Sequence, residues 1–189
     1  VSTIGAEVTT VSTITALSAI TNAKSEQTAF VKDSLRGGTF VLSTLTGNTV
    51  DNGVIFSSAI TGYVWKRDIS NATSLNIAWF GAIPDGTTDN ITALNATRDA
   101  AINNSNLPKV IYVPKGGTFL FSGTFTIPAD FGIVGDGSRA STLKGTNAGL
   151  LIRLGDDAAS ALIYGTSIKD LRILIDNAVG IGIRLSNTA

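Results

Sequence analysis

Carboxylates, with Lys, Tyr and backbone groups, are what could carry chemistry in this 189-residue sequence. The sequence contains neither histidine nor cysteine, so it lacks the usual general base near neutral pH, the commonest metal ligand and any thiol nucleophile. Two Asp or Glu side chains can still cleave a glycosidic bond, because one protonates the leaving oxygen while the other activates water or attacks the sugar. The candidate acids are Asp85 and Asp89 near the middle of the chain, and Asp136, Asp156, Asp157, Asp170 and Asp176 further along.

The spacing of the later acids argues against a catalytic pair. Asp170 and Asp176 lie on nearly one extended path, which separates them by up to ~20 Å at ~3.3 Å per residue. Glycosidases place their two carboxyl groups about 5–9.5 Å apart. Asp156-Asp157 is typical of a solvated corner, and Asp136 stands between two glycines, as turn residues do. We therefore expect no catalytic residue, no cofactor and no metal site in this sequence.

The two central acids belong to the stretch WFGAIPDGTTDNITALNATRDAA. Pro84-Asp85-Gly86 predicts a turn, because proline presets φ and glycine tolerates positive φ. Asp89 or Asn90 is well placed to cap the helix that follows by accepting a hydrogen bond from a free backbone N–H. Both carboxylates thus have a structural explanation that requires no chemistry.

The helix that must follow this cap is predicted from Ile91 to about Ile102, before Pro108 prevents its continuation. Residues that share one face of this helix are small, apart from one leucine; they are Ala93, Leu94, Thr97, Ala100 and Ala101. A face of this kind can lie close against the end of a sheet.

The segments after the helix alternate apolar side chains between Gly, Asn and Asp corners, as in residues 171–175 and 181–185. No helical pattern separates them, which excludes doubly wound and barrel folds of alternating helices and strands. An antiparallel sandwich and a parallel β-solenoid remain. Asn-Gly and Asp-Gly hairpin turns are scarce, and strand–corner units recur every twenty-odd residues, so the solenoid fits better. A solenoid needs a cap on its first coil, which the helix would supply.

The region before the cap shows two patterns. Residues 1–24 carry apolar side chains at helical spacing among poor helix formers, which indicates either a short inter-chain helical bundle or a flexible leader. Residues 28–69 contain four strand-like runs between glycine-rich turns. Trp65 in the last run is most simply a core residue, and an exposed sugar platform is the less favoured role.

These motifs together resemble a known family. The run WFGAIPDGTTDN, the small-residue helix, and the later VIYVPKGG, GIVGDG and TLKG are similar to the N-terminal signature of pectate-lyase-like proteins, which are right-handed parallel β-helices. The preceding AFVKDSLRGGTFVLS and YVWKRDI resemble the small module that comes before the β-helix in bacteriophage tailspikes. The resemblance implies a mostly β chain with three parts: a helical or flexible leader with possible trimer contacts (1–24), a small β-rich neck module (25–76), and a helix-capped start of a β-helix (77–189).

The resemblance also implies a function. Tailspikes of this type are homotrimers of the virion tail, bind bacterial surface polysaccharide, and in many cases cleave it. We expect this chain to be the virion-proximal part, attached to other tail or baseplate proteins through its N-terminal region, with polysaccharide binding and depolymerase activity located downstream. A secreted microbial polysaccharide lyase or glycosidase, and a non-enzymatic fibre or adhesin, are the alternatives. Because the sequence lacks an initiator Met and stops on an open strand, we expect it to be a piece of a longer polypeptide without hydrolytic activity of its own.

The composition does not indicate a nucleic-acid or membrane partner. The 14 basic and 14 acidic residues balance and form no Lys/Arg-rich tract, so nothing indicates nucleic acid or an anionic membrane surface. No apolar run approaches the ~20 residues of a membrane span, and the first residues lack the basic start of a secretory signal.

Overall fold

The computed structural model describes residues 8–146, 149–155, 165–176 and 180–185. The chain divides into two compact units, Val1–Asn71 and Ala72–Ala189. No helix among the described residues has both the length and the hydropathy needed to cross a lipid bilayer. Each unit is described separately below.

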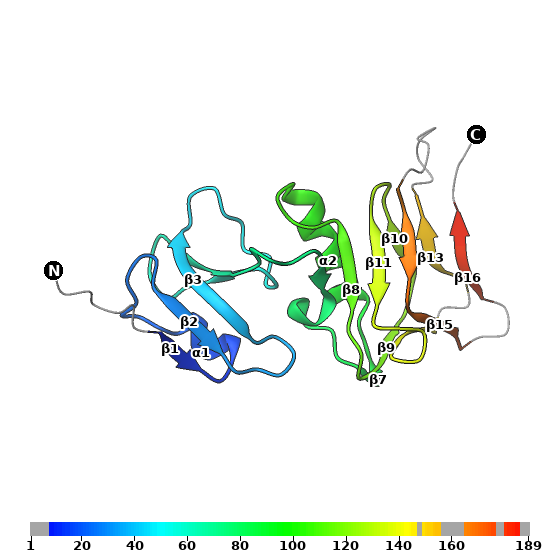
Figure 1. Cartoon of the computed structure of the whole chain (residues 1–189), viewed down its shortest axis with the longest axis horizontal. Coiled ribbons are helices and arrows are strands. Elements are labelled where there is room, and N and C mark those ends of the chain that lie inside the picture. The colour runs from blue at the N-terminus through cyan, green and yellow to red at the C-terminus, as the bar shows by residue number, and fades with distance from the viewer. Residues whose placement is uncertain (1–7, 147–148, 156–164, 177–179, 186–189) are drawn as a thin grey trace. The chain divides into compact units, whose positions relative to one another are not determined.

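A five-stranded sheet forms the first unit (Figure 1). Its strands, in spatial order, are β1 (Thr9–Val11), β2 (Thr28–Val31), β3 (Gly38–Thr44), β5 (Tyr63–Arg67) and β4 (Ile55–Ser57). The strands β2, β3, β5 and β4 are antiparallel neighbours, and they correspond to the four runs predicted between residues 28 and 69. β1 joins the edge of this sheet in parallel with β2.

Alternate side chains of these strands form the core of the first unit. Phe40 and Leu42 of β3 and Trp65 of β5 are fully buried together with Leu17 of α1 (Ile14–Ser18). The register places Leu42 opposite Trp65, and the ring of Phe56 meets Phe40 edge-on with 5.6 Å between centroids. Burial of Trp65 agrees with the core role predicted for it, because its ring cannot reach a sugar.

The helical stripe predicted for residues 1–24 is only partly present. Residues 1–7 lie outside the described part of the chain. Thr9–Val11 is a strand, and the helix is limited to Ile14–Ser18, where the Thr13 hydroxyl accepts the Ala16 N–H at 3.1 Å. Leu17 then inserts into the core of the same sheet. The apolar side chains of this segment therefore pack within the same chain. Residues 9–11 form a strand because they can pair with the free edge of β2.

A buried guanidinium binds backbone carbonyls in two loops of the first unit. Arg67, at the end of β5, is only 4% exposed. It donates three hydrogen bonds to backbone carbonyls: Nε to Gly53 at 3.0 Å, Nη1 to Gly37 at 2.6 Å and Nη2 to Arg36 at 2.8 Å. The guanidinium also lies 4.6 Å from the centroid of the Phe40 ring. Burial and the nearby charge of Arg36 lower the pKa of Arg67 to about 10, so the group stays charged near neutral pH.

The second unit is built from coils of short strands (Figure 1). The unit opens with β6 (Leu75–Asn76), the 3-10 helix η1 (Ile77–Phe80), β7 (Asp85–Asp89) and α2 (Ile91–Asn103). Successive coils then follow as β8 (Val110–Val113), β9 (Gly117–Phe121) and β10 (Phe125–Ile127); β11 (Gly132–Gly135), β12 (Ser141–Gly145) and β13 (Leu150–Leu154); and β14 (Ser167–Lys169), β15 (Arg172–Ile175) and β16 (Ile181–Leu185).

Every described strand pair in the second unit is parallel. Equivalent strands of successive coils form three sheets, β6-β8-β11-β14, β7-β9-β12-β15 and β10-β13-β16. The solenoid prediction is thereby confirmed and the antiparallel sandwich is excluded. Inward side chains stack in columns: Phe119 lies opposite Leu143 in the register, and Phe125 lies opposite Ile152. All four are fully buried.

Helix α2 covers the first coil, as predicted. It spans Ile91–Asn103, contacts η1 and β10, and buries the five residues expected on its inner face, from Ala93 to Ala101. Leu94 is fully buried, and the Thr97 hydroxyl satisfies itself by donating to the Ala93 carbonyl at 2.8 Å. At the opposite end of the stack, inward positions Ile181, Ile183 and Leu185 of β16 are exposed to solvent.

Candidate functional site

The expected turn at Pro84-Asp85-Gly86 is a bulge inside strand β7. Asp85 pairs with Thr118 and Asp89 pairs with Leu120, so three residues of β7 oppose one residue of β9. The carboxylate of Asp85 holds the bulge, because it accepts the N–H groups of Thr87 and Thr88 at 2.9 and 2.7 Å and the Thr88 hydroxyl at 2.7 Å. Gly86 has φ +74° inside this loop, where a side chain would be strained.

Asp89 connects the start of α2 to the corner after β9. Its Oδ1 accepts the N–H of Ile91, the first helical residue, at 3.0 Å and the N–H of Ser122 at 3.0 Å. Its Oδ2 accepts the Ser122 hydroxyl. Asp89 therefore supplies the capping bond that was expected from either Asp89 or Asn90, and it also joins two segments that are distant in the sequence.

Asn90 occupies the N-cap position, but its side chain makes no capping bond. The amide is 1% exposed and binds four backbone groups instead. Its oxygen accepts the Ile83 N–H at 2.7 Å, and its nitrogen donates to the carbonyls of Ile83, Thr88 and Leu120 at 3.1, 2.8 and 2.9 Å. Asn90 thus binds the chain before the bulge, the bulge itself and strand β9 at one point.

Close backbone contact fixes the position of the bulge. The Thr118 N–H donates to the Pro84 carbonyl at 3.2 Å. A Cβ atom added at Gly117 would lie 2.1 Å from that same carbonyl oxygen, so a side chain at Gly117 would push the two strands apart. Pro84 and Gly117 together bring β7 against β9, and Leu94 of α2 is buried in the core beneath.

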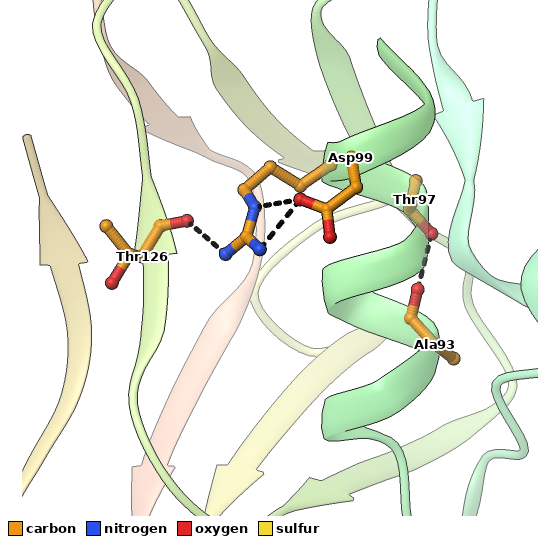
Figure 2. A network of polar contacts seen from close by, with 5 residues as sticks. Ala93, Thr97, Asp99 and Thr126 are labelled. Carbon is orange, nitrogen blue, oxygen red and sulfur yellow. Dashed lines mark hydrogen bonds and ion pairs between the residues drawn. The ribbon is translucent and has the colours of Figure 1, made fainter. Parts of the chain in front are cut away.

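Arg98 joins α2 to strand β10 of the first coil, and its two partners, Asp99 and Thr126, are labelled in Figure 2. Its Nε and Nη2 approach Asp99 Oδ1 at 2.8 and 2.7 Å, and its Nη1 donates to the Thr126 carbonyl of β10 at 3.1 Å. The guanidinium carbon lies 5.9 Å from the centroid of the Phe125 ring. The Arg98 side chain thus follows the edge of the buried face, which is how a long cation covers apolar surface.

Asp136 connects two coils through a separate set of contacts. Its Oδ2 accepts the Tyr112 hydroxyl at 2.6 Å and the Lys115 N–H at 2.7 Å. Its own N–H donates to the Ser141 hydroxyl at 2.9 Å, and that hydroxyl donates to the Val113 carbonyl at 2.8 Å. The residue does stand at a corner, and this corner joins β8 to β12.

The contact with Asp136 should be visible in the titration of Tyr112. Burial and the hydrogen bond to the carboxylate raise the pKa of Tyr112 to about 12. A raised phenol pKa means that the stabilisation is present below the unfolded value near 10 and is lost as pH rises through 12. We expect Asp136→Asn to lower the Tyr112 pKa towards its ordinary value. Tyrosinate absorbance in a background of Tyr63→Phe and Tyr164→Phe measures this, with Asp170→Asn as the control. An unchanged titration in Asp136→Asn would contradict the assignment.

The remaining candidate acids are not brought together. Asp170 is the corner residue between β14 and β15, with φ +54°, and its carbonyl accepts the Gly137 N–H at 2.7 Å. Asp176 forms an ion pair with Lys144 at 2.8 Å on the neighbouring coil. Asp156 and Asp157 lie outside the described residues.

The pKa values of Asp85, Asp89 and Asp136 are lowered, whereas the pKa of a general acid must be raised towards neutrality. Hydrogen bonds from the hydroxyl and N–H of Thr88 and the N–H of Thr87 hold the pKa of Asp85 well below its usual range. Partial burial raises the pKa of Asp89, but hydrogen bonds from Ser122 and Ile91 outweigh it, so the pKa is lowered. The Tyr112 hydroxyl and the Lys115 N–H lower the pKa of Asp136. The hydrogen bonds that these three carboxylates accept stabilise their charged form. Each carboxylate holds a backbone segment in place.

Two family profiles match the chain. The family described as rhamnogalacturonase A/epimerase, pectate lyase-like, matches residues 74–179. The phage tail protein small four-stranded β-sheet domain matches residues 10–71. These two ranges follow the two compact units, and β1 is the strand added to the four of that description. No curated protein sequence matches significantly.

Solved structures share the architecture. Tailspike protein 2 of an Escherichia coli O157:H7 bacteriophage is 20% identical, with TM-score 0.69 over 89% of this chain and 22% of that one. Tailspike gp49 of Acinetobacter baumannii bacteriophage Fri1, described as a capsular polysaccharide depolymerase, is 12% identical, with TM-score 0.67 over 94% and 37%. Pantoea stewartii WceF, described as a glycan biofilm modifying enzyme, is 21% identical, with TM-score 0.58 over 95% and 30%. The chain therefore spans 22% to 37% of the length of these proteins, and the likeness establishes the fold.

Proposed function

The chain belongs to the pectate lyase-like family of rhamnogalacturonase A and epimerases, and from this premise we propose that it is the virion-proximal part of a phage tailspike. The observation that carries the proposal is the order of its two units. A small phage tail β-sheet domain at residues 10–71 leads directly into helix-capped parallel coils that match from residue 74.

The first unit favours a tailspike over a secreted lyase or glycosidase, because the domain it matches is described for phage tail proteins. The same region also aligns with the bacterial enzyme WceF, so the measurements below are needed to decide between them. A non-enzymatic fibre or adhesin on the same fold would differ only at sites beyond the capped start of the stack, because a fold does not by itself fix a function. The carboxylates of Asp85, Asp89 and Asp136 accept backbone N–H groups, and that of Asp176 pairs with Lys144, which supports placing depolymerase activity in later coils.

The partners follow from the same proposal. The protein forms a homotrimer on the phage tail, is attached to other tail or baseplate proteins through its N-terminal region, and meets bacterial surface polysaccharide through coils after those described. The exposed inward row of β16, with Ile181, Ile183 and Leu185 in solvent, supports a continuation of the stack, because such a row is normally covered by the next coil.

Two measurements test the proposal. Light scattering of a purified protein with residues 1–189 and of a longer natural chain should give three copies per particle for the longer chain, and a stable monomer of that chain would favour the secreted enzyme. Both proteins are then incubated with capsular polysaccharide, and the reducing or unsaturated ends that are released are counted. We expect release only from the longer chain. Sugar release by residues 1–189 would overturn the location of the activity.

A further inference from the structure

The first unit contains the single Asn-Gly pair of the sequence, Asn52-Gly53. Asn52 is exposed and has φ +59°, and the following glycine has no side chain to obstruct its nitrogen. Asn52 and Gly53 lie in the tight loop that leads into β4 (Ile55–Ser57), where the Asn52 N–H donates to the Ile55 carbonyl at 3.0 Å. Asn52 is thus exposed, whereas the Gly53 residue that follows it is buried, with its N–H held by a side-chain oxygen of Asp51.

We propose that Asn52-Gly53 is a site of self-modification, at which the folded protein promotes loss of ammonia from Asn52. The Gly53 nitrogen attacks Cγ of Asn52 and forms a cyclic imide. The bond between Cγ and Nδ2 breaks, and the side-chain nitrogen leaves as ammonia, taking up the proton that the Gly53 nitrogen loses. Water then opens the imide at either carbonyl, which yields aspartate or isoaspartate. No oxidant or reductant is needed.

Asp51 is placed to receive the proton that must leave. Its Oδ1 accepts the Gly53 N–H at 2.8 Å, so a carboxylate already contacts the nitrogen that has to become a nucleophile. A positioned base of this kind accelerates proton transfer most when it lies within hydrogen-bond reach. The same oxygen accepts the N–H groups of Val54 and Ile55 at 2.7 and 2.9 Å, which hold the carboxylate in this position.

Arg36 acts on the other end of the same peptide group. Its Nη2 donates to the carbonyl oxygen of Asn52 at 2.6 Å. That carbonyl and the Gly53 N–H belong to one amide, so negative charge that develops on loss of the proton is shared with the oxygen facing the guanidinium. A cation placed where charge develops stabilises the transition state. Asp51 and Arg36 therefore activate the same nitrogen from two sides.

The products would alter the hydrogen bonds that Arg67 makes in the first unit. The Gly53 carbonyl accepts Nε of Arg67 at 3.0 Å, and Arg36 contributes both the bond to Asn52 and a carbonyl to Arg67. Isoaspartate adds a carbon to the main chain between Asn52 and Gly53, which displaces the Gly53 carbonyl. The modification would thus weaken the Arg67 contacts over time in protein that remains folded.

The test compares the folded and unfolded chain. Protein with residues 1–189 is incubated in mildly alkaline buffer with and without urea, digested, and analysed by mass spectrometry and isoaspartate labelling. We expect conversion at Asn52 well ahead of the exposed Asn106, and faster in buffer than in urea by on the order of 10-fold. Conversion at Asn52 that is equal or slower in buffer would overturn the proposal.

Two variants identify the groups that act. Asp51→Asn keeps an oxygen acceptor for the three N–H groups and removes the base, and Arg36→Gln removes the cation. We expect each variant to slow conversion in buffer by roughly 10-fold while leaving the rate in urea unchanged. Circular dichroism and urea unfolding verify that each variant is folded. A folded Asp51→Asn variant that converts as fast as the parent would show that local sequence alone sets the rate.

Discussion

Replacing Arg67 with methionine is expected to lower the free energy of unfolding of the first unit by roughly 3–5 kcal/mol. Methionine fills part of the same volume but donates nothing, so the carbonyls of Gly53, Gly37 and Arg36 lose the donors that reach them at 3.0, 2.6 and 2.8 Å. A buried acceptor left without a partner costs about 1–3 kcal/mol. The contact of the guanidinium with the Phe40 ring at 4.6 Å is lost as well.

Lysine at this position separates the effect of charge from that of geometry. Arg67→Lys retains a cation, but a single ammonium cannot match the fork that reaches three carbonyls. We expect it to be destabilising by nearly as much as Arg67→Met, since both leave carbonyls without donors. If Arg67→Lys lowers the free energy of unfolding by less than about 1 kcal/mol, the site requires the positive charge and not the forked geometry of the guanidinium.

Fluorescence can report the first unit alone. The sequence has two tryptophans; Trp65 is buried in the core of the first unit, and Trp79 lies in η1 of the second. In a Trp79→Phe background, urea unfolding followed by Trp65 emission gives the stability of the first unit. Lys32→Met is the matched control, because it removes an exposed cation from the same unit and should change stability by less than about 0.5 kcal/mol.

The second large effect is expected for Asn90→Asp. This change keeps the shape and the oxygen that accepts the Ile83 N–H, and replaces the nitrogen by a second oxygen. That oxygen would face the carbonyls of Ile83, Thr88 and Leu120, which now receive hydrogen bonds at 3.1, 2.8 and 2.9 Å. At neutral pH we expect a loss of roughly 3–5 kcal/mol from the stability of the second unit, because a carboxylate would be buried among acceptors.

The pH dependence of this variant has a definite sign. Three neighbouring carbonyl oxygens disfavour the charged form, so the folded-state pKa of the new carboxyl is raised above its unfolded value near 4. The protonated form can donate one hydrogen bond and fits the site better. Part of the lost stability should therefore be present below about pH 4 and disappear as pH rises through the folded pKa. The parent protein has no titrating group at this position and should not show this recovery.

Trp79 emission in a Trp65→Phe background follows the second unit for this measurement. Asn106→Asp makes the same substitution at an exposed position after α2, and should change stability little at any pH. If Asn90→Asp and Asn106→Asp unfold at the same urea concentration at neutral pH, the central role of the Asn90 amide is refuted.

Local pattern was sufficient for much of the fold. The inner face of α2 was predicted correctly because Ala93, Leu94, Thr97, Ala100 and Ala101 follow from helical spacing, and each is buried. The parallel coils were predicted from strands that lack hairpin turns, and the register confirms them. Both features depend on residues close together in the sequence.

Contacts between distant residues could not be predicted in this way. Asn90 has the residue type and position of an N-cap, and nothing near it in the sequence indicates that its amide reaches Leu120. Arg67 ends an ordinary strand, and its carbonyl partners, such as Arg36, are set by the fold of the intervening chain. Residues 9–11 continue a helical spacing, yet the free edge of β2 recruits them as a strand.

The bulge in β7 gives the stack a polarity. At the N-terminal end of the stack, the chain between Asp85 and Asp89 leaves the regular register with β9. Helix α2 covers the core at the same end. No further extended strand can therefore be added there. Above β14, β15 and β16 the edges remain regular in register. Lengthening is therefore possible in one direction only, as in a filament with one blocked end. Whole-coil duplications that arise in evolution should accumulate after the first coil and never ahead of α2.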